Sequence, residues 1–257
     1  MKHSALIHIL SVIAIALATT TAARAAVLNI NPTSDTLIAD SSLANTNYNG
    51  ISSLEIGGQN AGYISRSLFQ FDVSALGSAV IVSSIKLNLT TSYVANPGDL
   101  THTITLHEVS QSWTPSQVTW NDRATSTAWT PSAGGTYAAT AIGSYDWNFP
   151  STSGLNSSNS TFTIDILPGA GNQAARDSLI NSWYSTPASN FGLLLKMNTE
   201  SSNVYGLGLR STENSGGGIP SLEITYTAVP EPSSMMLMLA ASAGLVFWAR
   251  RRRHAVR

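Results

Sequence analysis

Arginine side chains in the middle of the chain are the residues best suited to bind an acidic ligand. Arg66 and Gln70 are four residues apart, so they share one face of an extended strand. A guanidinium group binds a carboxylate through two parallel hydrogen bonds, which makes an exposed arginine a candidate ligand contact. The alternative is that Arg66 and Arg123 pair with acids nearby in sequence, such as Asp72 or Asp122.

Tryptophan side chains offer a second kind of chemistry, because an indole face can stack on the apolar side of a sugar ring. Trp129 and Trp147 lie among Ser, Thr, Pro and Gly residues, so we predict them as ligand contacts. Trp120 and Trp183 follow apolar patterning and are predicted in the core. The alternative for every tryptophan is a core position with its N–H group hydrogen-bonded nearby.

Acidic and amide side chains near the N-terminus could bind a cation. Asp35, Asp40, Asn45 and Asn47 offer several oxygen ligands of the kind that calcium prefers. Asx residues also stabilise turns without any ion, and that is the alternative. Calcium is therefore the one possible cofactor that the sequence suggests.

Catalytic patterns are missing from the sequence. His102 and His107 are five residues apart on a predicted strand, so they point to opposite faces and cannot form one metal site. The chain has no cysteine, no Gly-x-Ser-x-Gly elbow and no evident carboxylate dyad. Gly206-Leu207-Gly208 lies in a predicted strand, without the helix that a phosphate loop needs. We predict a protein that is not an enzyme.

Charge excludes one class of partner. Residues 27–227 carry six basic and 13 acidic side chains, a net charge of −7. Proteins that bind nucleic acid do so through basic patches, so we expect no nucleic-acid partner.

Alternation of apolar and polar residues predicts strands. The segments 68–73, 85–89, 162–166 and 222–226 alternate with period 2, which is typical of a sheet with one face in the core. We expect Phe69, Phe71 and their counterparts in the other segments to be buried. Gly, Asn, Ser and Pro clusters separate the strands, as in an all-β jelly-roll-like β-sandwich. The other predicted strands are at 36–39, 54–57, 101–109, 145–149, 191–197 and 205–210.

Two segments carry helical signals instead. Thr114-Pro115-Ser116-Gln117 has the spacing of a capping box and predicts one or two turns of helix. Residues 172–184 place Ala175, Leu179, Ile180, Trp183 and Tyr184 on one face, which predicts a helix capping an open end of the sandwich.

Both ends of the chain resemble export signals. Lys2, the apolar stretch 5–17 and Ala23-Arg24-Ala25 have the order of a signal peptide, with cleavage by signal peptidase expected after Ala25. Residues 228–257 contain Pro230, Glu231 and Pro232, then an uncharged stretch at 233–249, then Arg250, Arg251, Arg252 and Arg253. The 17-residue stretch is near the lower limit for a membrane-spanning helix, and the arginines would hold its end in the cytoplasm.

This three-part tail resembles the PEP-CTERM sorting signal of bacterial envelope proteins that are processed by exosortases. The resemblance implies a transient membrane anchor, cleaved near Pro230–Pro232 during export, and a location that is secreted or at the cell surface. The alternatives are a permanent single-span anchor and a buried core helix.

The domain at 27–227 resembles the DNRLRE family, which has been grouped with family 96 of the carbohydrate-binding modules. Quoted in chain order, the segments that carry the resemblance are Asp35-Thr36, Asn47-Tyr48, Leu54-Glu55-Ile56-Gly57, Arg66 to Asp72, Ser112-Trp113, Val118 to Asn121, Arg123, Trp129, Gly134-Gly135, Ser182-Trp183, Asn190 to Leu195, Leu209-Arg210-Ser211 and Pro220-Ser221-Leu222. The hexapeptide that names the family is absent.

The resemblance implies a jelly-roll module that binds acidic polysaccharide such as alginate, with Arg123 and Arg210 at family positions. The predicted ligand-binding residues are therefore Arg66, Gln70, Arg123, Trp129, Trp147 and Arg210. We predict an exported, non-catalytic protein that binds exopolysaccharide or joins the producer's matrix. The alternatives are a structural surface or biofilm protein without specific sugar contacts, and a polysaccharide lyase or hydrolase.

Overall fold

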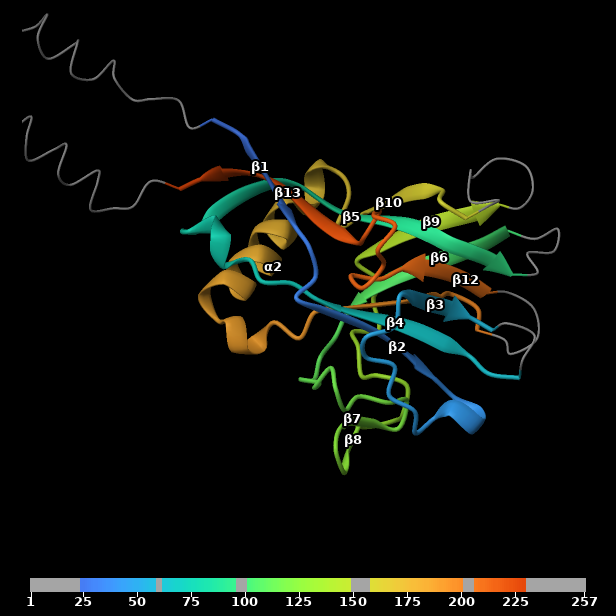
Figure 1. Ribbon diagram of the computed structural model, residues 1–257. Coiled ribbons are helices and arrows are strands. Elements are labelled where there is room, and N and C mark those ends of the chain that lie inside the picture. The colour runs from blue at the N-terminus through green and yellow to red at the C-terminus, as the bar shows by residue number, and fades with distance from the viewer. Residues whose placement is uncertain (1–23, 59–61, 96–100, 149–157, 201–205, 230–257) are drawn as a thin grey trace, which may run out of the picture. The chain divides into compact units, whose positions relative to one another are not determined.

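Antiparallel strands dominate the computed structural model, which describes residues 24–58, 62–95, 101–148, 158–200 and 206–229 (Figure 1). The all-β prediction is confirmed, and each predicted strand is present with bounds shifted by a few residues. The strands are β1 (Ala26–Ile30), β2 (Ser34–Ala39), β3 (Ser53–Gly57), β4 (Ser65–Gln70), β5 (Val80–Ala95), β6 (Thr101–Glu108), β7 (Asp122–Ala124), β8 (Thr127–Ala128), β9 (Gly143–Asn148), β10 (Thr161–Asp165), β11 (Leu193–Met197), β12 (Gly206–Arg210) and β13 (Ser221–Ala228).

The described strands form one 11-stranded sheet and the separate pair β7–β8. The main path runs β1-β13-β5-β12-β3-β4-β11-β6-β9, with β10 paired to β5 and β2 paired to β4. A single antiparallel bridge between Gly143 and Ile166 brings the start of β9 next to β10. The sheet therefore curls back on itself, because β10 is already a neighbour of β5. A cavity of about 500 Å³ lies along this seam, lined in part by Tyr145, Asp146 and Asp165.

The main core fills the inside of the curled sheet. Every side chain that the alternation marked as buried lies in it. These residues are Phe69, Phe71, Leu87, Leu89, Ile164, Ile166, Leu222 and Ile224. Because successive side chains of a strand point to opposite faces, the residues between these core positions lie on the outer face of the sheet.

A second core covers part of the outer face. Ile38 on β2, Leu68 on β4 and Leu194 on β11 point away from the main core and pack under the segment 109–138. That segment contributes Val109, Trp113, Val118 and Trp129 to the cluster. Strand β11 is consequently buried along its whole length, on both faces.

Helix α2 (Gln173–Ser185) confirms the longer predicted helix and lies beside the start of β5 (Figure 1). Its inner face is formed by Arg176, Leu179, Ile180 and Trp183. At 114–117, where one or two helical turns were predicted, the chain makes a single turn closed by hydrogen bonds from the N–H groups of Gln117 and Val118 to Thr114 O. Single 3-10 turns lie at η1 (Ser41–Leu43), η2 (Ser74–Leu76), η3 (Ala170–Asn172) and η4 (Pro187–Ser189).

The predicted export signals fall almost entirely outside the described residues. Residues 1–23 and 230–257, including the 233–249 stretch, are not among them. Within the described ranges, no helix has the length and apolar character needed to cross a membrane.

Candidate functional site

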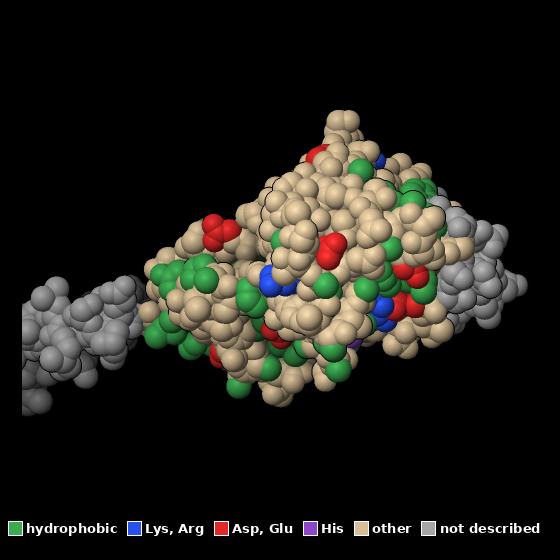
Figure 2. All heavy atoms as spheres, turned by 90° about the horizontal axis from the view of Figure 1, so that it is seen from below, with side chains coloured by type: hydrophobic (Ala, Val, Ile, Leu, Met, Phe, Trp, Pro, Cys, Tyr) green, Lys and Arg blue, Asp and Glu red, His purple; other side chains and the backbone are tan. Residues whose placement is uncertain are grey.

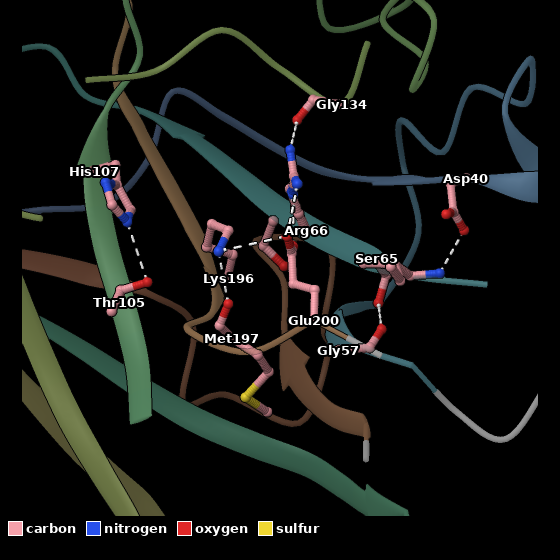
Figure 3. Close-up of polar contacts among 12 residues, drawn as sticks. Asp40, Gly57, Ser65, Arg66, Thr105, His107, Gly134, Lys196, Met197 and Glu200 are labelled. Atoms are coloured by element: carbon pink, nitrogen blue, oxygen red, sulfur yellow. Dashed lines mark hydrogen bonds and ion pairs between the residues drawn. The ribbon is translucent and has the colours of Figure 1, made fainter. Parts of the chain in front are cut away.

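Arg66 is engaged by the protein itself. Its Nε and Nη2 groups each donate to Glu200 at 2.7 Å, and its Nη1 group donates to Gly134 O. The guanidinium also lies 4.6 Å from the ring centroid of Trp120. Figure 3 shows Arg66 held between Gly134 and Glu200. Arg66 therefore pairs with an acid of the protein, as the alternative reading of the sequence expected. The acid is Glu200, 134 residues away in sequence, and not Asp72.

The same carboxylate holds a second cation. Lys196 on β11 lies with Nζ 3.4 Å from Glu200 and donates to Met197 O at 2.8 Å. Burial lowers the pKa of Lys196, while the charge of Glu200 acts in the opposite direction. On the neighbouring strand, His107 is hydrogen-bonded to Ala138 O through Nδ1. Its Nε2 atom is hydrogen-bonded to Thr105 Oγ1 (Figure 3). Burial lowers the pKa of His107. Because Arg66, Lys196 and His107 all have partners inside the protein, this cluster is an internal network and not an open cationic groove.

Position 134 requires glycine for two reasons. Its backbone φ is +90°, and the space that a Cβ atom would occupy is already filled by other side chains. A Cβ atom there would lie 2.7 Å from Arg66 Nη1 and 2.8 Å from Trp120. Glycine adopts this conformation without steric cost, so it lets the carbonyl group reach the guanidinium. The segment 109–138 therefore closes over Arg66.

The two tryptophans predicted as ligand contacts are buried, which corrects that prediction. Trp129 is 3% exposed, lies in the second core, and donates from Nε1 to Thr119 O at 3.0 Å. Trp147 is fully buried in the main core beside His102. Neither ring can stack on a sugar. Trp183 is a core residue as predicted, and Trp120 packs against the second core while half-buried.

The remaining predicted ligand contacts lie apart from one another. Gln70, at the end of β4, is half-buried. Arg123, on β7, donates to Ser112 O at 3.1 Å and to its Oγ at 3.0 Å. Arg210, on β12, donates from Nη1 to Gly216 O and Gly217 O, and from Nη2 to Asn159. Arg210 thus meets only uncharged acceptors among the described residues.

The four predicted calcium ligands do not form one site. Asp35 and Asp40 stand at opposite ends of β2, about 16 Å apart for five residues of extended chain. Asp35 accepts hydrogen bonds from Thr212, and Asp40 accepts one from Ile64 N.

The amide side chains of that set are also engaged. Asn45 accepts a hydrogen bond from Asn121 at 2.8 Å, and Asn47 donates to Pro115 O and Val118 O. In the described ranges, no group of three or more His, Asp or Glu side chains is arranged to hold a metal ion.

A different polar cluster lies on the outer face of β3, β12 and β5. Leu54, Ile56, Leu207 and Leu209 point into the main core, so Glu55, Gly208 and Arg210 lie on the opposite face. The register places Gly208 between Glu55 on one side and Tyr93 on the other. We call the surface formed by Glu55, Tyr63, Tyr93, Gly208 and Arg210 the tyrosine face.

Hydrogen bonds join the acidic and aromatic members of the tyrosine face. The hydroxyl groups of Tyr93 and Tyr63 donate to Glu55 Oε2 at 2.9 Å and 3.3 Å. Burial raises the pKa of Glu55, although the hydrogen bonds partly oppose this. Burial and the nearby carboxylate raise the pKa of Tyr63 to about 12 and that of Tyr93 further, so both phenols stay protonated at neutral pH.

The prediction of site residues missed this cluster. Glu55 belongs to the predicted strand 54–57, and nothing in the local sequence links it to Tyr93. One signal was present: Gly206 and Gly208 put two glycines on one face of a strand, which often marks the close approach of another group.

Charged groups are sparse on the surface. On the face shown in Figure 2, the backbone and side chains that are neither charged nor hydrophobic cover most of the area, and basic side chains lie in small separate groups near acidic ones. This agrees with the low content of charged residues, 11% of the sequence.

Two family models match the sequence. Residues 26–146 match carbohydrate-binding module family 96, and residues 228–253 match the PEP-CTERM protein-sorting motif. The first match contains Glu55, Tyr63 and Tyr93, whereas Trp147 and Arg210 lie beyond it. A search among curated proteins gave no match. The resemblance drawn from the sequence is thereby confirmed over two segments: residues 26–146 are similar to carbohydrate-binding module family 96, and residues 228–253 are similar to the PEP-CTERM sorting motif.

Proposed function

We propose that the protein is an exported, non-catalytic module that binds exopolysaccharide through the tyrosine face. The match to a carbohydrate-binding module family suggests a sugar partner, and the PEP-CTERM motif suggests exosortase-dependent sorting to the cell envelope or surface. We further propose that the tail anchors the protein only until it is cleaved, after which the domain joins the producer's matrix.

The observation that carries the choice of surface is the position of Tyr93. Its half-buried ring lies on Gly208, and its hydroxyl group is fixed by Glu55. A tyrosine ring packed against a sheet offers apolar carbon atoms and a polar hydroxyl group together, which suits a sugar ring. Arg210 lies two residues from Gly208 on the same strand face, so it places a positive charge on this surface.

A glycan array probed with residues 27–227 tests the proposal. Binding to at least one polysaccharide, without release of reducing ends or unsaturated products, is the expected result. Absence of binding to every glycan would favour the alternative of a structural surface or biofilm protein. Product release would instead favour a lyase or hydrolase.

A further inference from the structure

We infer that the tyrosine face selects an uncharged, hydroxyl-rich sugar, which stacks on Tyr93 and donates a hydroxyl hydrogen bond to Glu55. This inference rests on the proposed function and names the ligand class of the same surface. It differs from the acidic ligand that the arginine residues suggested from the sequence.

The first support is a stacking platform that depends on one glycine. A Cβ atom at Gly208 would lie 2.2 Å and 2.3 Å from two ring carbons of Tyr93, closer than real side chains approach. The ring therefore lies directly on the backbone of β12 and reaches across it to β3. Strands are about 4.8 Å apart, so a tyrosine side chain is long enough to bridge from β5 to a carboxylate on β3.

The second support is an unused hydrogen-bond acceptor. Glu55 is 6% exposed, and its Oε2 atom accepts both tyrosine hydroxyl groups. Its Oε1 atom accepts no hydrogen bond from any described residue. The nearby Ser65 hydroxyl donates elsewhere, to Gly57 O at 2.8 Å. A buried carboxylate oxygen without a partner is unfavourable, and a sugar hydroxyl group that displaced the side chains covering Oε1 would supply the missing donor.

The third support is charge. Glu55 would repel the carboxylate of a uronic acid stacked on Tyr93, and the domain as a whole is acidic. Arg210 is the cation of this face, but its two Nη groups already hold Gly216, Gly217 and Asn159. One carboxylate and one guanidinium leave the tyrosine face with no net charge, so an uncharged sugar fits it best.

The test compares a neutral glucan and a uronic-acid polymer as ligands, by calorimetry. The protein is expressed as the full chain and purified after export. The parent protein should prefer the neutral polymer, with an affinity that stays constant between about 50 and 500 mM salt because no charge pair is screened. Tyr93→Ala should weaken this binding by about tenfold or more, as for an aromatic anchor. Tyr184→Ala, on helix α2, is the matched control and should bind like the parent.

Two further variants keep the test decisive if Tyr93→Ala does not fold. Gly208→Ala displaces the ring without removing it and should also weaken neutral binding. Glu55→Gln removes the repulsive charge and should reduce the preference for neutral over acidic polymer, whereas Glu223→Gln, a carboxylate on β13, should leave that preference unchanged.

The outcomes separate the inference from the proposed function. Salt-sensitive binding of the uronic-acid polymer, lost in Arg210→Gln and retained in Gly208→Ala, would overturn the inference and leave polysaccharide binding intact. Failure of the parent to bind either these polymers or any glycan on the array would overturn both.

Discussion

Two acidic side chains, one buried and one partly buried, hold together parts of the chain that are distant in sequence. Asp35 is 2% exposed and accepts hydrogen bonds from the N–H and hydroxyl groups of Thr212, at 2.9 Å and 3.1 Å. Glu200 binds both Arg66 and Lys196. Removing either acid leaves buried donors without acceptors, so we expect both to matter more for stability than for binding.

The ionisation of Asp35 should make stability depend on pH. Burial, assisted by the charge of Glu213, raises its pKa from 3.8 to about 7, although the Thr212 hydrogen bonds oppose this. The folded state therefore binds more protons than the unfolded state between these values, so stability should fall as pH rises from about 4 to 7. Asp35→Asn should remove this part of the slope.

Urea denaturation at several pH values measures the effect. The quantity compared is the difference in free energy of unfolding between the parent and Asp35→Asn, because other ionisable groups also contribute to the pH dependence of each protein. A difference in free energy of unfolding that does not change with pH would show that Asp35 stays ionised in the folded protein.

Arg66 should contribute to stability through Glu200. We expect Arg66→Ala to lower the free energy of unfolding by roughly 3 kcal/mol, because it leaves a partly buried carboxylate with one cation fewer. The control is Lys86→Ala: its ion pair with Glu223 spans 3.7 Å and is far more exposed, so its loss should cost no more than about 1 kcal/mol. Equal effects of the two substitutions in urea denaturation would contradict the prediction.

Strands could be predicted from the sequence because their signal is local. Alternation over five or six residues reports which side faces the core, and Phe69, Leu87 and Ile164 lie where it placed them. The same signal was available for Trp147, which alternates with the exposed residues Ser144 and Asp146. Its polar neighbours in sequence favoured an exposed position and were misleading.

The second core could not be predicted in the same way. Leu68 and Leu194 face away from the main core, and only the folded path of the segment 109–138 covers them. The partner of Arg66 and the link between Glu55 and Tyr93 also depend on strand order, which no short sequence pattern encodes. The site residues were therefore less predictable than the strands.

At the start of β5, side chains of helix α2 form the backbone hydrogen bonds that a neighbouring strand would otherwise form. Asn181 accepts a hydrogen bond from Val80 N and donates one to Val80 O, each at 2.8 Å. Asp177 accepts a hydrogen bond from Val82 N. These side chains satisfy backbone groups that would otherwise form an open sheet edge.

Asn181→Ala should therefore destabilise the protein by about 1–3 kcal/mol, because both backbone groups of Val80 lose their partners in a half-buried position. The matched control is Ser178→Ala, on the exposed face of the same helix, which should change stability by less than about 0.5 kcal/mol. Chemical denaturation of both variants decides the point. Similar stabilities would mean that water replaces the side chain without cost.

At the scale of the whole molecule, the sorting motif predicts processing. We expect the mature protein to lack everything beyond about Glu231, because the PEP-CTERM motif spans residues 228–253. Mass spectrometry of the exported protein measures its C-terminus. Replacing Arg250, Arg251, Arg252 and Arg253 with neutral residues should impair retention and sorting by removing the cytoplasmic anchor. An intact C-terminus on mature protein would contradict cleavage.

Strand β1 pairs with β13 alone among the described strands, with Ala26 opposite Tyr226. Of the described strands, the first to be synthesised therefore has no partner strand until the last has been synthesised. At usual rates of synthesis the intervening 200 residues take about 10–40 s. A chain that ends before Ser221 can never complete this edge, and it also lacks the tail that follows. A truncated chain of this kind therefore lacks both strand β13, which completes the sheet edge, and the sorting motif.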